Sequence, residues 1–186
     1  MPPKVKVTKE DIMNTAVEII RQNGPQSINA RTIAAKLNCS TQPIFSNFAT
    51  MEELRLAVVE KADTLCQAYI QREVECGQFP TYKASGMAYI RFAKEEKELF
   101  KLLYMCDRSG EPIPESSELT DKMEAIVHNN TGLDGWDAKL FHLEMWAFVH
   151  GIATMFATGF LDLDWELVSK MLTDSYQGLR KQYGME

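Results

Sequence analysis

The stretch RTIAAKLNCSTQPIFSNF, residues 31–48, limits the fold most, because it places a proline inside a short helical pattern. Proline has no backbone N–H and its ring collides with the carbonyl group four residues earlier, so a helix tolerates it only in the first turn. Pro43 therefore predicts a helix that is capped by Ser40 and ends near Ser46. A helix this short is unstable alone. The residues expected to pack it against its neighbours are Ile44, Phe45 and Phe48.

A second helix precedes this one across a tight turn. Asn29 is a suitable N-cap for a helix that runs to about Leu37. Asn38 follows at the position where the turn needs a left-handed residue, which asparagine tolerates better than most residues. Farther upstream, Thr8 caps a helix that stops at the segment Asn23-Gly24-Pro25. The first fifty residues therefore predict three helices.

Helical periodicity continues through the rest of the chain, and no convincing strand pattern interrupts it. Thr50 and Glu53 form a capping box that begins a longer helix reaching roughly Cys76. Proline and glycine residues predict a loop at residues 107–116. Five more helices are expected, at about residues 79–93, 94–105, 117–129, 136–159 and 165–182. The fold class is all-α, with a small three-helix head on residues 1–50, a linking helix on 51–77 and a larger helical body on 78–186.

The charge of the chain is unevenly distributed. The net charge is −6, but residues 1–50 carry six Lys/Arg and three acidic residues, so the head is basic and the body is acidic. A basic head on an acidic body suggests a polyanionic partner for the head alone. Apolar residues make up 45% of the chain, which is enough for a core.

Neither targeting nor disulfide signals stand out. No apolar run follows the N-terminal lysines, so no signal peptide is expected, and the apolar stretch 140–157 is interpreted as a buried helix because it contains ionisable residues. The four cysteines lack metal-type spacing and are expected to be free thiols in a cytoplasmic protein. No cofactor, metal site or membrane partner is predicted.

Two helices joined by a short turn, with a third packed behind them, describe a helix-turn-helix. At this point the sequence resembles the TetR family of bacterial transcriptional regulators over about residues 8–56. The residues in register with the family pattern are Thr32-Ile33-Ala34, Leu37-Asn38-Cys39-Ser40, Phe45, Phe48 and Glu53-Leu54. The segment WAFVHG, Trp146 to Gly151, also resembles a Trp…His-Gly signature of one type of TetR C-terminal domain.

The resemblance implies a set of contacts to double-stranded DNA. Gln42 and Thr41 would face the major groove, where glutamine can pair with adenine. Pro43 would touch a thymine methyl, and Arg31 would reach phosphate or a base edge. The full set of expected DNA-binding residues is Lys4, Lys6, Arg31, Ser40, Thr41, Gln42, Pro43, Phe45 and Asn47.

Three residues depart from the family pattern at positions that usually hold phosphate oxygens. Phe45 and Asn47 stand where the family usually has Tyr and His, and Met51 stands where it often has Lys. Because phosphate contacts supply most of the sequence-independent affinity, binding is expected to be weaker or more salt-sensitive than is usual for the family.

The body is expected to dimerise and to bind a ligand. The helix at 136–159 is apolar on several faces, which suggests that one side meets the interior and another a second copy. The helix at 165–182 would complete a four-helix interface through Trp165, Val168, Leu172, Tyr176 and Leu179. The family resemblance implies the same homodimer and a small effector, and the apolar lining of the candidate pocket indicates a hydrophobic or aromatic compound. The candidate pocket residues are Met87, Tyr89, Phe92, Leu103, Tyr104, Phe141, Trp146 and His150.

Four other functions compete with that of a repressor that is released by its effector. An enzyme using Cys106 lacks a motif around its histidines, and a metal sensor lacks a zinc spacing at His142, Glu144 and His150. A thiol switch fails because Cys66 and Cys76 lie too far apart on one helix. The strongest alternative is a ligand-binding helical bundle whose DNA binding is weak or lost.

Overall fold

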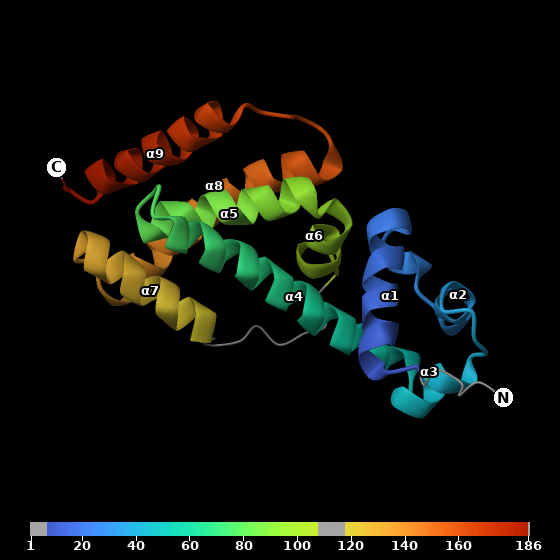
Figure 1. The fold of residues 1–186 in the computed structure, drawn as a ribbon. Coiled ribbons are helices and arrows are strands. Elements are labelled where there is room, and N and C mark those ends of the chain that lie inside the picture. The colour runs from blue at the N-terminus through green and yellow to red at the C-terminus, as the bar shows by residue number, and fades with distance from the viewer. Residues whose placement is uncertain (1–6, 108–117, 186) are drawn as a thin grey trace. The chain divides into compact units, whose positions relative to one another are not determined.

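The structure, a computed structural model, describes residues 7–107 and 118–185 (Figure 1). Within these residues the chain is helical and contains no strand, which confirms the all-α prediction. The predicted loop at 107–116 lies almost entirely outside the described residues, as do Lys4 and Lys6. The chain divides into two compact units, Met1–Gln67 with Glu96–Cys106, and Ala68–Glu95 with Asp107–Glu186.

Helix α1, Lys9–Asn23, begins at the predicted cap. The Asp11 N–H donates to Thr8 Oγ1 at 3.1 Å, and the Thr8 N–H donates back to the Asp11 carboxylate at 2.9 Å. This reciprocal pair satisfies two donors that a helix start leaves unpaired. At the other end Gly24 takes a positive φ of 84°, which ends the helix before the short 3-10 turn η1, Pro25–Ser27.

Helix α2, Ala30–Lys36, has the predicted Asn29 cap and the predicted left-handed turn. Asn38 has a φ of 51°, the one positive value at a non-glycine residue among the described residues. The Asn38 N–H donates to the Ala35 carbonyl at 3.2 Å and the Cys39 N–H to the Ala34 carbonyl at 3.0 Å. These two bonds form a Schellman motif, which closes the end of α2 and reverses the chain.

Helix α3, Gln42–Asn47, starts one residue later than a Ser40 cap predicts, so that cap prediction is wrong. Thr41 precedes the helix in a helical backbone conformation, and its carbonyl accepts from the N–H groups of Ile44 and Phe45. Pro43 is then the second helical residue, where its missing N–H still costs no hydrogen bond.

The packing of α3 differs from the prediction at one residue. Ile44 and Phe48 are buried, with 0% and 1% of their surface exposed, as expected. Phe45 is 50% exposed, so its ring does not hold the helix against its neighbours.

Helix α4, Met51–Cys76, crosses from the first unit into the second. The Glu53 N–H donates to Thr50 Oγ1 at 3.1 Å, as the capping box requires. The Glu53 carboxylate, however, accepts from the Ala49 N–H at 2.6 Å, one residue before the expected donor. Glu53 thereby stabilises the segment that connects α3 to the start of α4.

Helix α6, Lys97–Tyr104, belongs to the first unit although the sequence analysis placed these residues with the body. Leu99, Phe100 and Leu103 are buried where α6 packs against α1 and η1. Arg21 of α1 donates to both carboxylate oxygens of Glu96, at 2.7 and 2.6 Å. Such a two-pronged pair fixes orientation as well as distance.

The second unit contains the end of α4 together with α5, Thr81–Glu95; α7, Glu118–Thr131; α8, Gly135–Thr158; and α9, Trp165–Gln182. In Figure 1, α5 and α8 run side by side, with α9 next to them. Gly86 lets α5 come close to both partners, because a Cβ there would lie 3.1 Å from Leu172 Cδ2 and 3.4 Å from Val149 Cγ2. Its lack of a side chain therefore sets the spacing of the three helices.

Within one chain α8 is buried on one side only. Phe141 and Ile152 are buried, whereas Trp136, Leu143 and Trp146 are 73%, 57% and 43% exposed. Among the described residues α8 alone has the length and hydropathy that a membrane span requires, as core helices of water-soluble proteins also do.

Helix α9 differs from the prediction in where its apolar face packs. Val168 and Leu172, expected to meet a second copy, are 0% and 3% exposed inside their own chain. Tyr176 and Leu179 pack against the core cluster around Phe141. The reason is the close approach at Gly86, which draws this face of α9 onto α5 and α8.

Candidate DNA-binding surface and ligand sites

The head presents its polar residues on α2, on the turn and on the first turn of α3. Arg31, Ser40 and Gln42 are exposed, and Thr41 and Pro43 are half-buried. The Schellman motif at Asn38 holds the start of α3 against α2. These five predicted contact residues thus lie on α2, in the turn that follows it and at the start of α3.

Arg31 and Gln42 have side chains that are available for new bonds. Arg31 makes no side-chain hydrogen bond or ion pair with the part of the chain that is described, whereas nearby Lys36 lies 3.1 Å from Glu18. The backbone carbonyl of Gln42 accepts a hydrogen bond from the Ser46 hydroxyl at 2.9 Å. The side-chain amide of Gln42 has no hydrogen-bond partner among the described residues. A free amide can both donate to and accept from a base edge.

Asn47 is engaged inside the head. Its side-chain amide donates to the Pro43 carbonyl at 2.8 Å and to the Val7 carbonyl at 3.4 Å. An amide nitrogen carries two hydrogens, so both are used. Asn47 therefore ties the segment before α1 to α3, a role that no pattern in the sequence indicated.

The predicted ligand residues are divided between the two units. Leu103 and Tyr104 lie in the first unit, whereas the other six lie in the second. Met87, Phe92 and Phe141 are buried core residues.

Three of the predicted ligand residues form a connected aromatic and imidazole group. The Tyr89 hydroxyl lies 2.9 Å from His150 Nδ1, and the Trp146 ring stacks on the His150 ring with 4.9 Å between centroids. Burial lowers the pKa of His150 below its usual value of 6.5, because the charged ring loses solvent.

A cavity of about 510 Å³ lies between α5 and α9, within the size range of small-molecule sites. Of the eight predicted ligand residues, Met87 lines it. Sequence reasoning missed the rest of this cavity, because its walls meet only in the folded chain. The lining residues are Gln78, Phe79, Lys83, Met87, Arg91, Trp165, Glu166, Ser169, Lys170, Thr173 and Asp174.

Comparison with solved structures shows the fold alone, since the identities are low. A protein with unknown function from Rhodococcus sp. RHA1 is 21% identical, with a TM-score of 0.73 over 98% of both chains. A TetR-like transcriptional regulator from Rhodococcus sp. RHA1 is 14% identical, with a TM-score of 0.69 over 96% of this chain and 98% of the other. The multidrug binding protein EbrR, complexed with imidazole, is 17% identical, with a TM-score of 0.62 over 90% of this chain and 93% of the other.

Comparison at the level of sequence families is more specific. No curated protein sequence matches this chain. A family model described as the tetracyclin repressor-like C-terminal domain matches residues 82–174, which is half of the 186 residues. The match runs from α5 through α8 and includes the first half of α9. With a helix-turn-helix head and this C-terminal domain, the chain belongs to the TetR family of transcriptional regulators.

Proposed function

We propose that the protein is a ligand-responsive repressor that binds a palindromic operator as a homodimer and leaves it when a small hydrophobic effector binds. Gln42 carries the proposal, because its exposed amide has no partner within the described residues and stands at the start of α3. Such an amide matches the edge of an adenine in the major groove.

The other contacts of the head follow from position and chemistry. Arg31 and Ser40 approach phosphate, and Thr41 and Pro43 enter the groove beside Gln42. Lys4 and Lys6 add basic charge from outside the described residues. Phe45 offers only apolar contact, and Asn47 contacts DNA only by giving up an internal hydrogen bond.

The exposed side of α8 supports the homodimer. Trp136 and Leu143 are seven residues apart and lie on one face of the helix, with Trp146 close to that face. Large apolar side chains grouped on one face of a helix mark an interaction surface. The partner copy covers this face, together with exposed Leu167 on α9. Two heads then contact half-sites that lie about 34–36 Å apart, one turn of DNA.

The domain assignment follows the same division of labour. Residues 1–50, continued by the linking helix 51–77, bind DNA, and residues 78–186 bind the effector and dimerise, although α6 within this range packs in the first unit. The chemistry of the effector is apolar or aromatic, in keeping with the aromatic residues of the second unit. A regulator of this kind acts in the cytoplasm and performs no catalysis.

One alternative has its own support, a ligand-binding helical protein whose DNA binding is weak or lost. Phe45 presents a bare ring where the family usually has a hydroxyl group, and Met51 cannot donate a hydrogen bond. These positions usually supply phosphate contacts, and phosphate contacts dominate affinity.

Fluorescence anisotropy distinguishes the two functions. Labelled DNA from immediately upstream of the gene and a scrambled duplex are titrated with protein at low and near-physiological salt. A repressor prefers a two-fold symmetric site in the first duplex, and Gln42→Ala abolishes that preference while Gln182→Ala, a control on exposed α9 surface, keeps it. Absence of binding to either duplex at low salt would favour the alternative.

A gain-of-contact variant tests the departures from the family pattern. Met51→Lys restores a cation at the start of α4 and should raise affinity for both duplexes. Unchanged affinity would mean that this position is remote from phosphate.

A further inference from the structure

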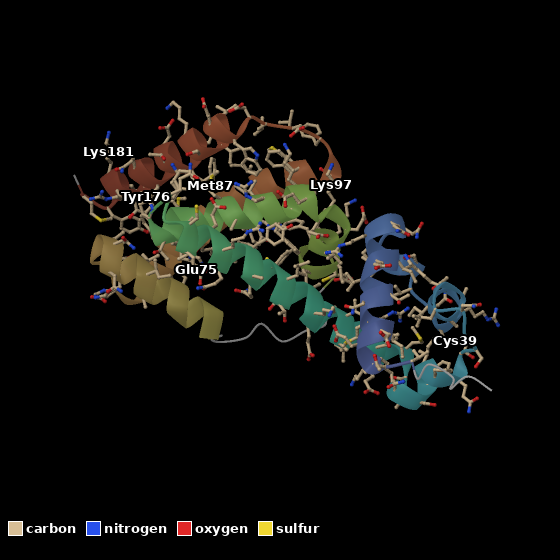
Figure 2. All side chains as sticks on the ribbon, in the orientation of Figure 1. Cys39, Glu75, Met87, Lys97, Tyr176 and Lys181 are labelled. Atoms are coloured by element: carbon tan, nitrogen blue, oxygen red, sulfur yellow. The ribbon has the colours of Figure 1, made fainter. Side chains whose placement is uncertain are left out.

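The cavity between α5 and α9 is a groove with one wall on each helix. Lys83, Met87 and Arg91 stand four residues apart on α5, so they line one face of that helix. Ser169 and Thr173 face them from α9. Figure 2 labels Met87 on α5, just below α9 in this view.

Side-chain sizes explain why the groove is open here. At Gly86 the two helices nearly touch, because its ideal Cβ would lie 3.1 Å from the Leu172 side chain. Beside that contact the α9 residues are the small Ser169 and Thr173, which leave space above Met87. Met87 is 3% exposed and forms an apolar floor. Phe79 and Trp165 add aromatic surface to the lining.

Lys83 lines this groove and has no carboxylate partner among the described residues. Its Nζ donates to Thr173 Oγ1 at 2.8 Å and lies 4.7 Å from the centre of the Phe79 ring. Both partners are uncharged, and no carboxylate of the described residues lies within ion-pair distance. Partial burial lowers the pKa of Lys83, so its charge would gain from an anionic partner.

The other two cations of the lining already have carboxylate partners. Lys170 Nζ lies 2.6 Å from the Asp174 carboxylate. Arg91 Nε lies 3.5 Å from Glu73, and its guanidinium group stacks over the Trp165 ring at 4.8 Å. An incoming anion would have to displace a carboxylate from Lys170 or Arg91, but it would displace none from Lys83.

The charge of the whole lining limits the ligand further. Glu166 places a carboxylate on the α9 side of the groove without an ion pair among the described residues, whereas Asp174 is paired with Lys170. The Glu166 carboxylate repels a second negative charge, so a singly charged anion fits better than a phosphate ester or a dicarboxylate. The apolar floor and the aromatic residues suit a hydrocarbon or aromatic body attached to that anion.

We propose that the groove between α5 and α9 binds a small amphipathic monocarboxylate. Its carboxylate group pairs with Lys83 Nζ beside the Thr173 hydroxyl, and its apolar body lies on Met87 toward Trp165. Binding here requires neither DNA nor a second copy of the chain. The test is therefore independent of the repressor function proposed above.

Isothermal titration calorimetry of the full chain tests this site with octanoate as the probe. Octanamide has the same body without the charge, and suberate has a second carboxylate at the far end. Octanoate should bind saturably at one site per chain. Octanamide should bind about tenfold weaker or more, the loss expected for one charged hydrogen bond. Suberate should also bind more weakly than octanoate, because the Glu166 carboxylate repels its second carboxylate.

Three variants tie the binding to the groove. Lys83→Gln should weaken octanoate about tenfold or more, whereas Lys181→Gln, a matched change at an exposed lysine of α9, should leave it unchanged. Ser169→Leu fills the space above Met87 and should abolish binding; its urea unfolding curve verifies the fold. The proposal is overturned if octanoate and octanamide bind alike, if both lysine variants behave alike, or if octanoate does not bind.

Discussion

Tyr89 and His150 join α5 to α8 through a hydrogen bond of 2.9 Å between the tyrosine hydroxyl and Nδ1 of the imidazole. The same pairing occurs two turns earlier on both helices, where the Tyr82 hydroxyl lies 3.0 Å from His142 Nδ1. Two tyrosines of α5 thus meet two histidines of α8 in the same order along the chain. The helices therefore run in parallel, and each pair fixes their register.

The first prediction concerns pH. Burial lowers the pKa of His150, so between 6.5 and this lowered value the unfolded chain binds a proton that the folded chain does not. The free energy of unfolding should therefore fall as pH drops through this range, and the contribution is fully present above it. Urea titrations at about pH 7.5 and about pH 5.5 measure the fall, which should be smaller in His150→Gln.

A histidine on the surface serves as the control for this experiment. His128 on α7 is exposed, and His128→Gln should not reduce the fall. An equal fall in wild type and His150→Gln would contradict the assignment to His150.

The second prediction concerns the turn of the helix-turn-helix. Asn38 has a φ of 51°, a conformation that most side chains disfavour. Asn38→Ala should lower the free energy of unfolding by about 1 kcal/mol, whereas Asn38→Gly should leave it nearly unchanged, because glycine adopts positive φ freely. Urea denaturation compares the two, and equal stability of the variants would show that the turn can relax to another conformation.

The third prediction concerns the exposed side of α8. Leu143 is 57% exposed in a single chain, so Leu143→Glu should convert the proposed dimer to a monomer without lowering the stability of the chain. Sedimentation velocity measures the change. Leu56→Glu provides a matched control, since Leu56 is 58% exposed on α4. A shift to monomer with Leu56→Glu alone would place the interface elsewhere.

The fourth prediction concerns thiol reactivity. Burial raises the pKa of Cys66 to about 11, and the Tyr104 hydroxyl, 3.4 Å from its Sγ, only partly offsets this. Because the thiolate is the reactive form, iodoacetamide at about pH 8 should modify exposed Cys76 and Cys106 in the native protein and Cys66 only after unfolding. Peptide mass spectrometry locates the label. Native labelling of Cys66 as fast as Cys76 would show that this core opens readily.

Local signals predicted most helix boundaries well. The caps at Thr8 and Asn29 and the left-handed Asn38 are confirmed, because each feature depends on neighbours within a few residues. The start of α3 was wrong, because a proline fits several positions in a first turn and Pro43 could not distinguish them. The predicted limits of the last helix, residues 165–182, are confirmed.

The packing of helices that lie far apart in the sequence was not predicted. The apolar face of α9, with Val168 and Leu172, has the same pattern whether it meets its own chain or another. Its burial follows from Gly86, whose importance appears only when α5, α8 and α9 are brought together. The groove at Lys83 was missed for the same reason, since its two walls lie about eighty residues apart in the chain. The DNA-contact residues stay predictions, with Arg31 and Gln42 unengaged and Asn47 engaged within the head.

The membership of α6 in the first unit bears on how this protein could be cut and recombined. The chain leaves that unit after Gln67 and returns at Glu96, so no single break in the backbone separates the two units. A fragment ending within α4 would lack Leu99, Phe100 and the Glu96 carboxylate, and would leave Arg21 and the surface of α1 that they cover in contact with water. Chimeric regulators made by exchanging heads would therefore need to transplant residues 96–106 together with the N-terminal helices.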